Sequence, residues 1–121
     1  MKVKNIKMEQ MIATLKPILK QRNKIGYIAA RNTRILNEHL TEYFQFKNEL
    51  IIKYGEKNID SDGKETAVID PNCPNFDKFK QEFQLIGEIE QDIDIMTLKY
   101  EDTIGFLTGE EILSVSWMLE D

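Results

Sequence analysis

The stretch NIDSDGKETAVID, residues 58–70, carries the oxygen-bearing side chains that a calcium-binding loop uses. Counted from its first residue, positions one, three, five and six match an EF-hand, and they hold Asn58, Asp60, Asp62 and Gly63. An EF-hand also needs a carboxylate at position twelve that binds the ion through both oxygens, and Ile69 stands there. The Asp-Gly pair is instead typical of a tight turn between two strands. The stretch therefore predicts a β-hairpin and no calcium site.

The remaining candidates for chemistry are a single cysteine, a single histidine and a pair of acids. Cys73 and His39 are too few for a zinc site, and a nucleophilic cysteine would need a base aimed at it. We interpret His39 as a partly buried residue of a helix. Glu110 and Glu111 follow Thr108 at a predicted helix N-terminus, where the helix dipole favours acidic side chains. The six glycines are scattered singly, without a phosphate-binding loop. We expect no enzyme, no cofactor and no metal.

Length and charge describe a single domain with two unlike parts. The chain has 121 residues, of which 41% are hydrophobic and 31% charged, with a net charge of −5. Residues 1–34 hold nine Lys and Arg and one acid, whereas residues 58–121 hold four Lys and sixteen acids. We expect a basic helical part at about 1–54 and an acidic α+β part at about 55–121. Without a membrane-length apolar run or signal-peptide features, the expected location is a cytoplasm, with no membrane partner.

Helical periodicity dominates the first half. Apolar residues follow one helical face from Met8 to Leu19, and Pro17 predicts that this helix ends or kinks near Lys16. A turn is expected at RNKIG, where Gly26 can adopt a backbone conformation that other residues avoid. From Tyr27 to about Tyr54 no Gly or Pro occurs, and one long helix is predicted. Its apolar stripe also predicts self-association of the chain. The residues that repeat every seven positions are Ala29, Leu36, Tyr43 and Leu50.

The second half mixes short strands and helices. TAVID and DIDIMTLKY read as strands, and LTGEEILSVSWMLED begins with a capping box from Thr108 to Glu111. A further helix, with Asn72 or Asn75 as its cap, has one apolar face made of Phe76, Phe79, Phe83 and Ile86. The predicted fold is α+β and mostly helical. It consists of a long central helix packed with two or three shorter helices and a small two- or three-stranded antiparallel sheet.

Four segments in this order carry a resemblance to a known family. They are IGYIAARNTRILNEHLTEYFQFKNELIIKYGEK, the DSDGK turn, FDKFKQEFQLIGEIEQDIDI and LTGEEILSVSWMLED. Together they resemble a family of short phage and prophage proteins of Gram-positive bacteria, classed as a domain of unknown function. The resemblance covers the chain after about residue 8, and Pro17 and the DPNCP insert depart from it. It implies a viral product that acts in the host cytoplasm or in the virion, and it carries over no functional residues.

Three non-catalytic functions are consistent with these features. The first is protein binding that inhibits or modulates a host or defence factor, and the second is an accessory or structural role in virion (tail) assembly. For both, the expected partner is a host or phage protein. The expected docking acids are Glu88, Glu90, Asp92, Asp94, Glu101 and Asp102. The third is nucleic-acid binding, which lacks a helix-turn-helix pattern and stacking aromatics. Its expected phosphate contacts are Lys20, Arg22, Lys24, Arg31 and Arg34.

Overall fold

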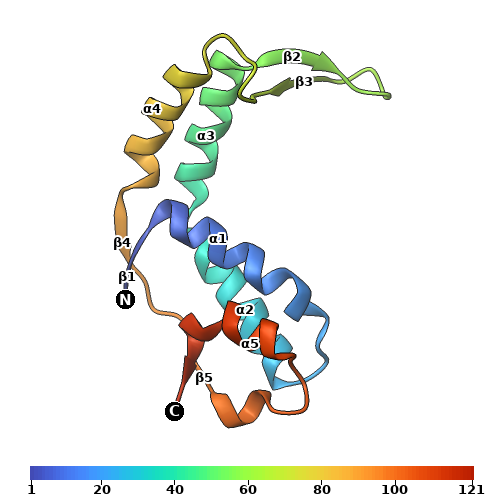
Figure 1. The fold of residues 1–121 in the computed structure, drawn as a ribbon, viewed down its shortest axis with the longest axis vertical. Coiled ribbons are helices and arrows are strands. Elements are labelled where there is room, and N and C mark those ends of the chain that lie inside the picture. The colour runs from blue at the N-terminus through green and yellow to red at the C-terminus, as the bar shows by residue number, and fades with distance from the viewer. The chain divides into compact units, whose positions relative to one another are not determined.

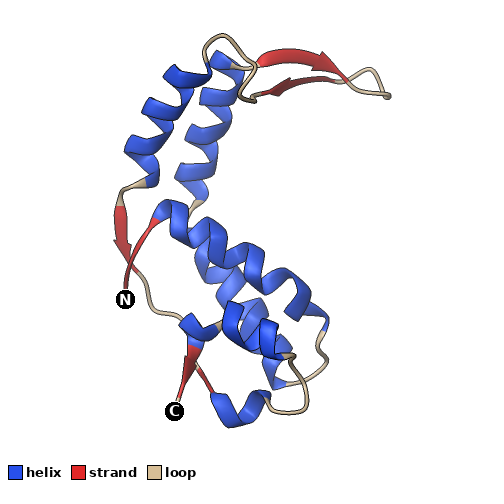
Figure 2. Ribbon diagram, viewed as in Figure 1, coloured by secondary structure: helices blue, strands red, loops and turns tan.

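A computed structural model describes residues 1–121 and shows a mostly helical α+β fold, as predicted (Figures 1 and 2). The chain divides into two compact units. Unit 1 combines Met1–Leu40 with Glu90–Asp121, and unit 2 is the segment Thr41–Ile89 between them. Unit 1 therefore joins the first 40 residues of the basic part to the last 32 residues of the acidic part.

The helices of unit 1 begin and end at signals in the sequence. Helix α1 (Asn5–Leu15) stops just before Pro17, as predicted, and a 3₁₀ helix continues to Lys20. Helix α2 (Lys24–His39) starts after Asn23, whose side-chain oxygen accepts the N–H groups of Ile25 and Gly26. Gly26, predicted to lie in a turn, is instead inside α2. A Cβ there would stand 1.9 Å from the Gln21 carbonyl oxygen, so glycine permits close packing.

The C-terminal segment of unit 1 consists of short elements. The capping box between Thr108 and Glu111 is present in both directions at the start of its helix, as predicted. Strand β1 pairs antiparallel with β4, and β5 pairs in parallel with β6, so unit 1 has two separate ladders instead of one antiparallel sheet. The bounds are β1 Lys2–Lys4, β4 Glu90–Asp92, β5 Leu98–Lys99, α5 Gly109–Ser114 and β6 Leu119–Glu120, with 3₁₀ turns at Tyr100–Thr103 and Ser116–Met118.

The predicted strand DIDIMTLKY is interrupted because a helix side chain binds its backbone. Strand β4 ends at Asp92, and β5 starts only at Leu98. Between them, the Met96 N–H donates to Asn32 Oδ1 at 2.7 Å, and Asn32 Nδ2 donates to the Met96 carbonyl at 2.9 Å. Asn32 is completely buried in α2. It therefore takes both backbone groups that a strand partner would have used.

The predicted single helix from Tyr27 to Tyr54 is two helices, α2 and α3 (Thr41–Tyr54), separated at Leu40. The cause is tertiary, since neither Gly nor Pro stands there. Gln91 Nε2 from β4 donates to the His39 carbonyl at 2.9 Å. In a continuing helix that carbonyl would accept the N–H four residues later. Leu40 adopts φ −100° and ψ 5°, and its side chain is buried.

Unit 2 consists of a helix pair and a hairpin. Helices α3 and α4 (Phe76–Gly87) lie side by side in Figure 1, and β2 (Glu56–Ile59) pairs antiparallel with β3 (Glu65–Val68). The hairpin turns at Gly63, with a φ of +79°, as the Asp-Gly pair predicted. Asn75 precedes α4, but its side chain makes no capping hydrogen bond. The core is aromatic, with the Phe79 and Phe83 rings stacked at 5.5 Å.

Candidate interaction surfaces

Unit 1 displays two large apolar side chains on a tight turn. The turn follows the 3₁₀ helix Tyr100–Thr103 and reverses at Gly105, with a φ of +85° that favours glycine. Ile104 is 72% exposed and Phe106 is 56% exposed. Because single exposed apolar residues are common, the relevant fact is that two of them flank one ordered reversal. We call residues 103–106 the apolar turn.

Hydrogen bonds and burial hold the apolar turn in place. The Phe106 N–H and the Leu107 N–H both donate to the Thr103 carbonyl, at 3.1 and 3.0 Å. Thr103 is completely buried, and its hydroxyl donates to the Tyr100 carbonyl at 2.7 Å. Gln21 Nε2 donates to the Phe106 carbonyl at 3.0 Å. The two exposed side chains are therefore presented by backbone anchored on both sides.

Acidic side chains accompany the apolar turn. Glu101 is exposed, and Asp102 forms an ion pair with Lys24 of α2, with Lys24 Nζ 3.6 Å from Asp102 Oδ2. Asp102, Lys24 and Phe106 line one shallow hollow of about 200 Å³, together with Asn23 and Ile25. The apolar turn thus combines an aromatic side chain with a carboxylate at its edge.

The six acids proposed from the sequence are distributed over several elements. Glu88 follows α4 in unit 2, and the others belong to unit 1. Glu90 and Asp92 point to the same face of β4, directly opposite Lys4 and Lys2 of β1. The terminal ammonium of Met1 also lies 3.0 Å from Asp92 Oδ1. Asp94 is exposed beyond β4. Glu88 and Glu90 flank Ile89, which is 52% exposed, and Glu101 and Asp102 precede the exposed Ile104 and Phe106.

The five cations proposed as phosphate contacts are all exposed in unit 1. Lys24, Arg31 and Arg34 have spacings that place them on one face of α2, near the 62% exposed Tyr27. Two of the three are engaged by carboxylates: Lys24 by Asp102, and Arg34 by Glu38, with Nε 3.1 Å from Oε1. Lys20 and Arg22 precede α2. The fold thus directs acids toward part of this basic surface.

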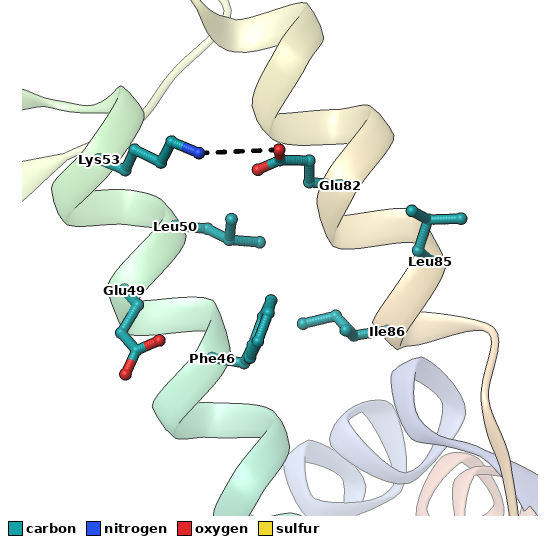
Figure 3. Close-up of a pocket in the computed structure, with 7 residues that line it drawn as sticks. All are labelled: Phe46, Glu49, Leu50, Lys53, Glu82, Leu85 and Ile86. Carbon is teal, nitrogen blue, oxygen red and sulfur yellow. Dashed lines mark ion pairs between the residues drawn. The ribbon is translucent and has the colours of Figure 1, made fainter.

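Unit 2 contains an apolar groove between α3 and α4, with a volume of about 420 Å³. Figure 3 shows Phe46 and Leu50 of α3 facing Ile86 of α4, with Lys53 and Glu82 meeting above them. Phe46 is 49% exposed, and Leu85, on the outer edge of α4, is 73% exposed. Phe79 and Phe83 belong to the aromatic core, as predicted, and do not line this groove.

Three charged side chains of both signs border the groove. Lys53 Nζ lies 3.8 Å from Glu82 Oε1. A hydrogen bond with Tyr54 and the nearby Glu82 carboxylate raise the pKa of Lys53 above its ordinary value. Lys53 therefore carries its positive charge at neutral pH. Glu49, one turn before it on α3, completes the border.

The residues first considered for catalysis or metal binding make contacts that belong to the fold. His39 is partly buried, as predicted, and its Nδ1 lies 3.2 Å from Gln91 Oε1. Cys73 is buried in unit 2, with its Sγ 3.7 Å from the Val68 carbonyl. In the calcium-like loop, Asp60 Oδ1 accepts the N–H groups of Asp62 and Lys64, both at 2.9 Å. No cluster of three or more His, Cys, Asp or Glu is arranged to hold a metal.

No protein-family model, curated protein or solved structure matches this chain. None of its helices combines the length and the apolar character that crossing a bilayer requires.

The apolar turn was not predicted from the sequence, although a signal for it exists. Ile104 and Phe106 flank a glycine immediately before the capping box at Thr108, where apolar residues have no helix face to join. The sequence predicts the groove only in part, because Leu50 and Ile86 belong to predicted apolar helix faces, whereas no pattern singles out Leu85. The sequence contains no signal for the polar contacts of Asn32 and Gln91, because each hydrogen-bond partner lies more than 50 residues away along the chain.

Proposed function

We propose that this protein is a non-catalytic binding protein of phage or prophage origin that modulates a host protein by docking through the apolar turn. The observation that carries the proposal is the display of Ile104 and Phe106 on an anchored reversal. Aromatic side chains that enter a pocket on the partner supply much of the binding free energy at many protein interfaces. Burying each of these two side chains would contribute about 1.5–3 kcal/mol.

The order of the turn favours binding because little conformational freedom is lost on docking. Its backbone is already hydrogen-bonded through Thr103 and through the Gln21 side chain. Preorganisation of this kind improves affinity by lowering the entropic cost of association.

Charge identifies the kind of partner. Glu101 is exposed beside the apolar residues, and Asp102 lies at the edge of the same hollow as Phe106. The complementary surface is an apolar pocket with Lys or Arg at its rim, on a host protein. Because Asp102 is already paired with Lys24, it is the exposed Glu101 that disfavours an anionic lipid surface or a nucleic-acid backbone.

The test is site-specific photocrosslinking in infected host cells. A photoreactive phenylalanine analogue replaces Phe106 in one variant and Ile52, an exposed residue of α3, in the control. One host protein should crosslink at position 106 and not at position 52. With that protein purified, Phe106→Ser should weaken binding about 30-fold, corresponding to about 2 kcal/mol, whereas Ile52→Ser should not.

Salt dependence tests the electrostatic part. Glu101→Gln should slow association with the purified partner at low ionic strength and lose this effect at high salt. Crosslinking of lipid or nucleic acid at position 106, or equal crosslinking at both positions, would refute the proposal. A virion protein as the specific partner would instead establish the assembly function.

A further inference from the structure

The helix pair of unit 2 is covered on one side of its seam and open on the other. On the covered side, Lys47 Nζ lies over the Phe83 ring, 5.4 Å from its centroid. On the open side, the groove exposes nearly half of Phe46, and Leu85 is largely exposed beside it. Two packed helices bury one stripe each, so the apolar side chains on the open side remain available to another helix.

The spacing of the groove residues matches the surface of an α-helix. On α3, Phe46, Leu50 and Lys53 stand at i, i+4 and i+7, and Glu82 and Ile86 stand at i and i+4 on α4. Rows of this kind accept the ridges of a helix that lies along the groove.

The order of charges on α3 indicates which helix fits. Glu49 precedes Lys53 by one turn, and both border the groove. When a second α3 lies antiparallel to the first, the order reverses, so Lys53 of each copy approaches Glu49 of the other. A partner surface with charges of only one sign would be complementary either to Lys53 or to Glu49, and not to both.

We propose that the groove is the site of self-association, filled by the α3–α4 pair of a second copy related by a twofold axis. The four helices form a bundle in which α3 of one copy lies antiparallel to α3 of the other. Phe46 and Leu50 of both copies are covered in this arrangement. The apolar turn of unit 1 does not take part, so dimerisation and host binding are separable.

The first experiment measures the mass of the full chain by sedimentation and light scattering over a range of concentrations. The wild type should form dimers, and Phe46→Lys should convert them to monomers by placing a charge in the bundle. The matched control is Ile52→Lys, a similar change at a 71% exposed residue of α3 that does not line the groove. It should leave the dimer intact.

The second experiment is a charge exchange that does not depend on tolerance of Phe46→Lys. Glu49→Lys alone and Lys53→Glu alone each place two like charges next to each other, at position 49 of one copy and position 53 of the other. The twofold axis creates this repulsion twice in each dimer. Each single variant should weaken dimerisation about tenfold. Because Lys53 also pairs with Glu82 of its own copy, the compensating variant changes that residue too. The triple variant E49K/K53E/E82K should restore most of the wild-type affinity, and circular dichroism should show unchanged helix content throughout.

A wild-type chain that stays monomeric across the concentration range would overturn the inference. So would a dimer that survives both Phe46→Lys and the single charge changes, or a triple variant E49K/K53E/E82K no better than either single one. Host binding through Phe106 can succeed or fail under any of these outcomes, because its readout is crosslinking in unit 1.

Discussion

Units 1 and 2 differ in how completely they bury their apolar side chains. All of the largest completely buried side chains lie in unit 1, including Met8, Leu36 and Met118. In unit 2 the most buried side chains, such as Tyr43 and Leu50, keep 4–8% exposure, and the helix pair retains an open groove. Unit 1 closes its core with segments from both ends of the chain. Unit 2 has only neighbouring segments available, so a closed core and an open surface arise within one small protein.

The two units also differ in how polar groups are used. In unit 1, buried and partly buried amides connect distant segments. Asn32 binds the Met96 backbone, and Gln91 Nε2 donates to both Asn5 Oδ1 and the His39 carbonyl. In unit 2, the hydrogen bonds of the Asp60 turn are local, and the ion pair between Lys53 and Glu82 lies at the surface. Buried polar contacts specify one arrangement, whereas surface pairs contribute little to stability.

The largest expected difference between the units comes from the same change in each core. Leu36→Ala in unit 1 should reduce the free energy of unfolding by about 3–5 kcal/mol, because it leaves a closed cavity. Leu50→Ala should cost about 2 kcal/mol or less, since one side of Leu50 already faces the groove. Urea unfolding in dilute solution, followed by Trp117 fluorescence for unit 1 and by amide hydrogen exchange of α3 and α4 for unit 2, measures both. Equal losses would contradict the contrast between the cores.

Asn32 tests the buried polar contacts of unit 1. Asn32→Ala should reduce the free energy of unfolding by about 2–3 kcal/mol, because the Met96 N–H and carbonyl lose their partners. Asn48→Ala, at an exposed position of α3, is the control and should change stability by less than about 0.5 kcal/mol. If Asn32→Ala is as mild as its control in urea unfolding, the Asn32 contacts do not stabilise unit 1.

Gly26 tests how closely unit 1 is packed. Gly26→Ala should reduce the free energy of unfolding by about 1–2 kcal/mol, despite the better helix propensity of alanine, because its Cβ would collide with the Gln21 carbonyl. The matched change Gly109→Ala meets no atom within 4 Å and should raise stability by about 0.4–1 kcal/mol. Thermal unfolding of both variants gives the comparison. A stabilising Gly26→Ala would refute the close approach.

The smallest expected effect is that of calcium on the unit 2 hairpin. Calcium titration by calorimetry should reveal no site tighter than about millimolar, the weak end of the EF-hand range. The reason is that Ile69 occupies the twelfth position while Asp60 Oδ1 accepts two backbone N–H groups within the turn. Asp60→Ala should accordingly weaken the hairpin without changing any response to calcium. Heat from a tighter site that Asp60→Ala abolishes would overturn this interpretation.

The sequence by itself determined features whose causes lie within a few residues. Pro17 ended α1, Thr108 and Glu111 formed a capping box, and the turn at Gly63 joined β2 to β3, each as predicted. The aromatic face of α4 was also predictable, because apolar residues at helical spacing must be buried together. Length, composition and the division of charge needed no structure at all.

Only the tertiary structure decided features that depend on distant partners. The Gln91 side chain, donating to the His39 carbonyl, accompanies the end of α2, and Asn32 interrupts the predicted strand at Met96. Lys2 and Lys4 lie opposite Asp92 and Glu90 across a ladder whose strands are far apart in the chain, so charge counting alone could not tell which acids face cations in the fold. The physical reason is that hydrogen-bonding groups and charges take whatever partner the fold brings near, and sequence periodicity carries no information about that partner.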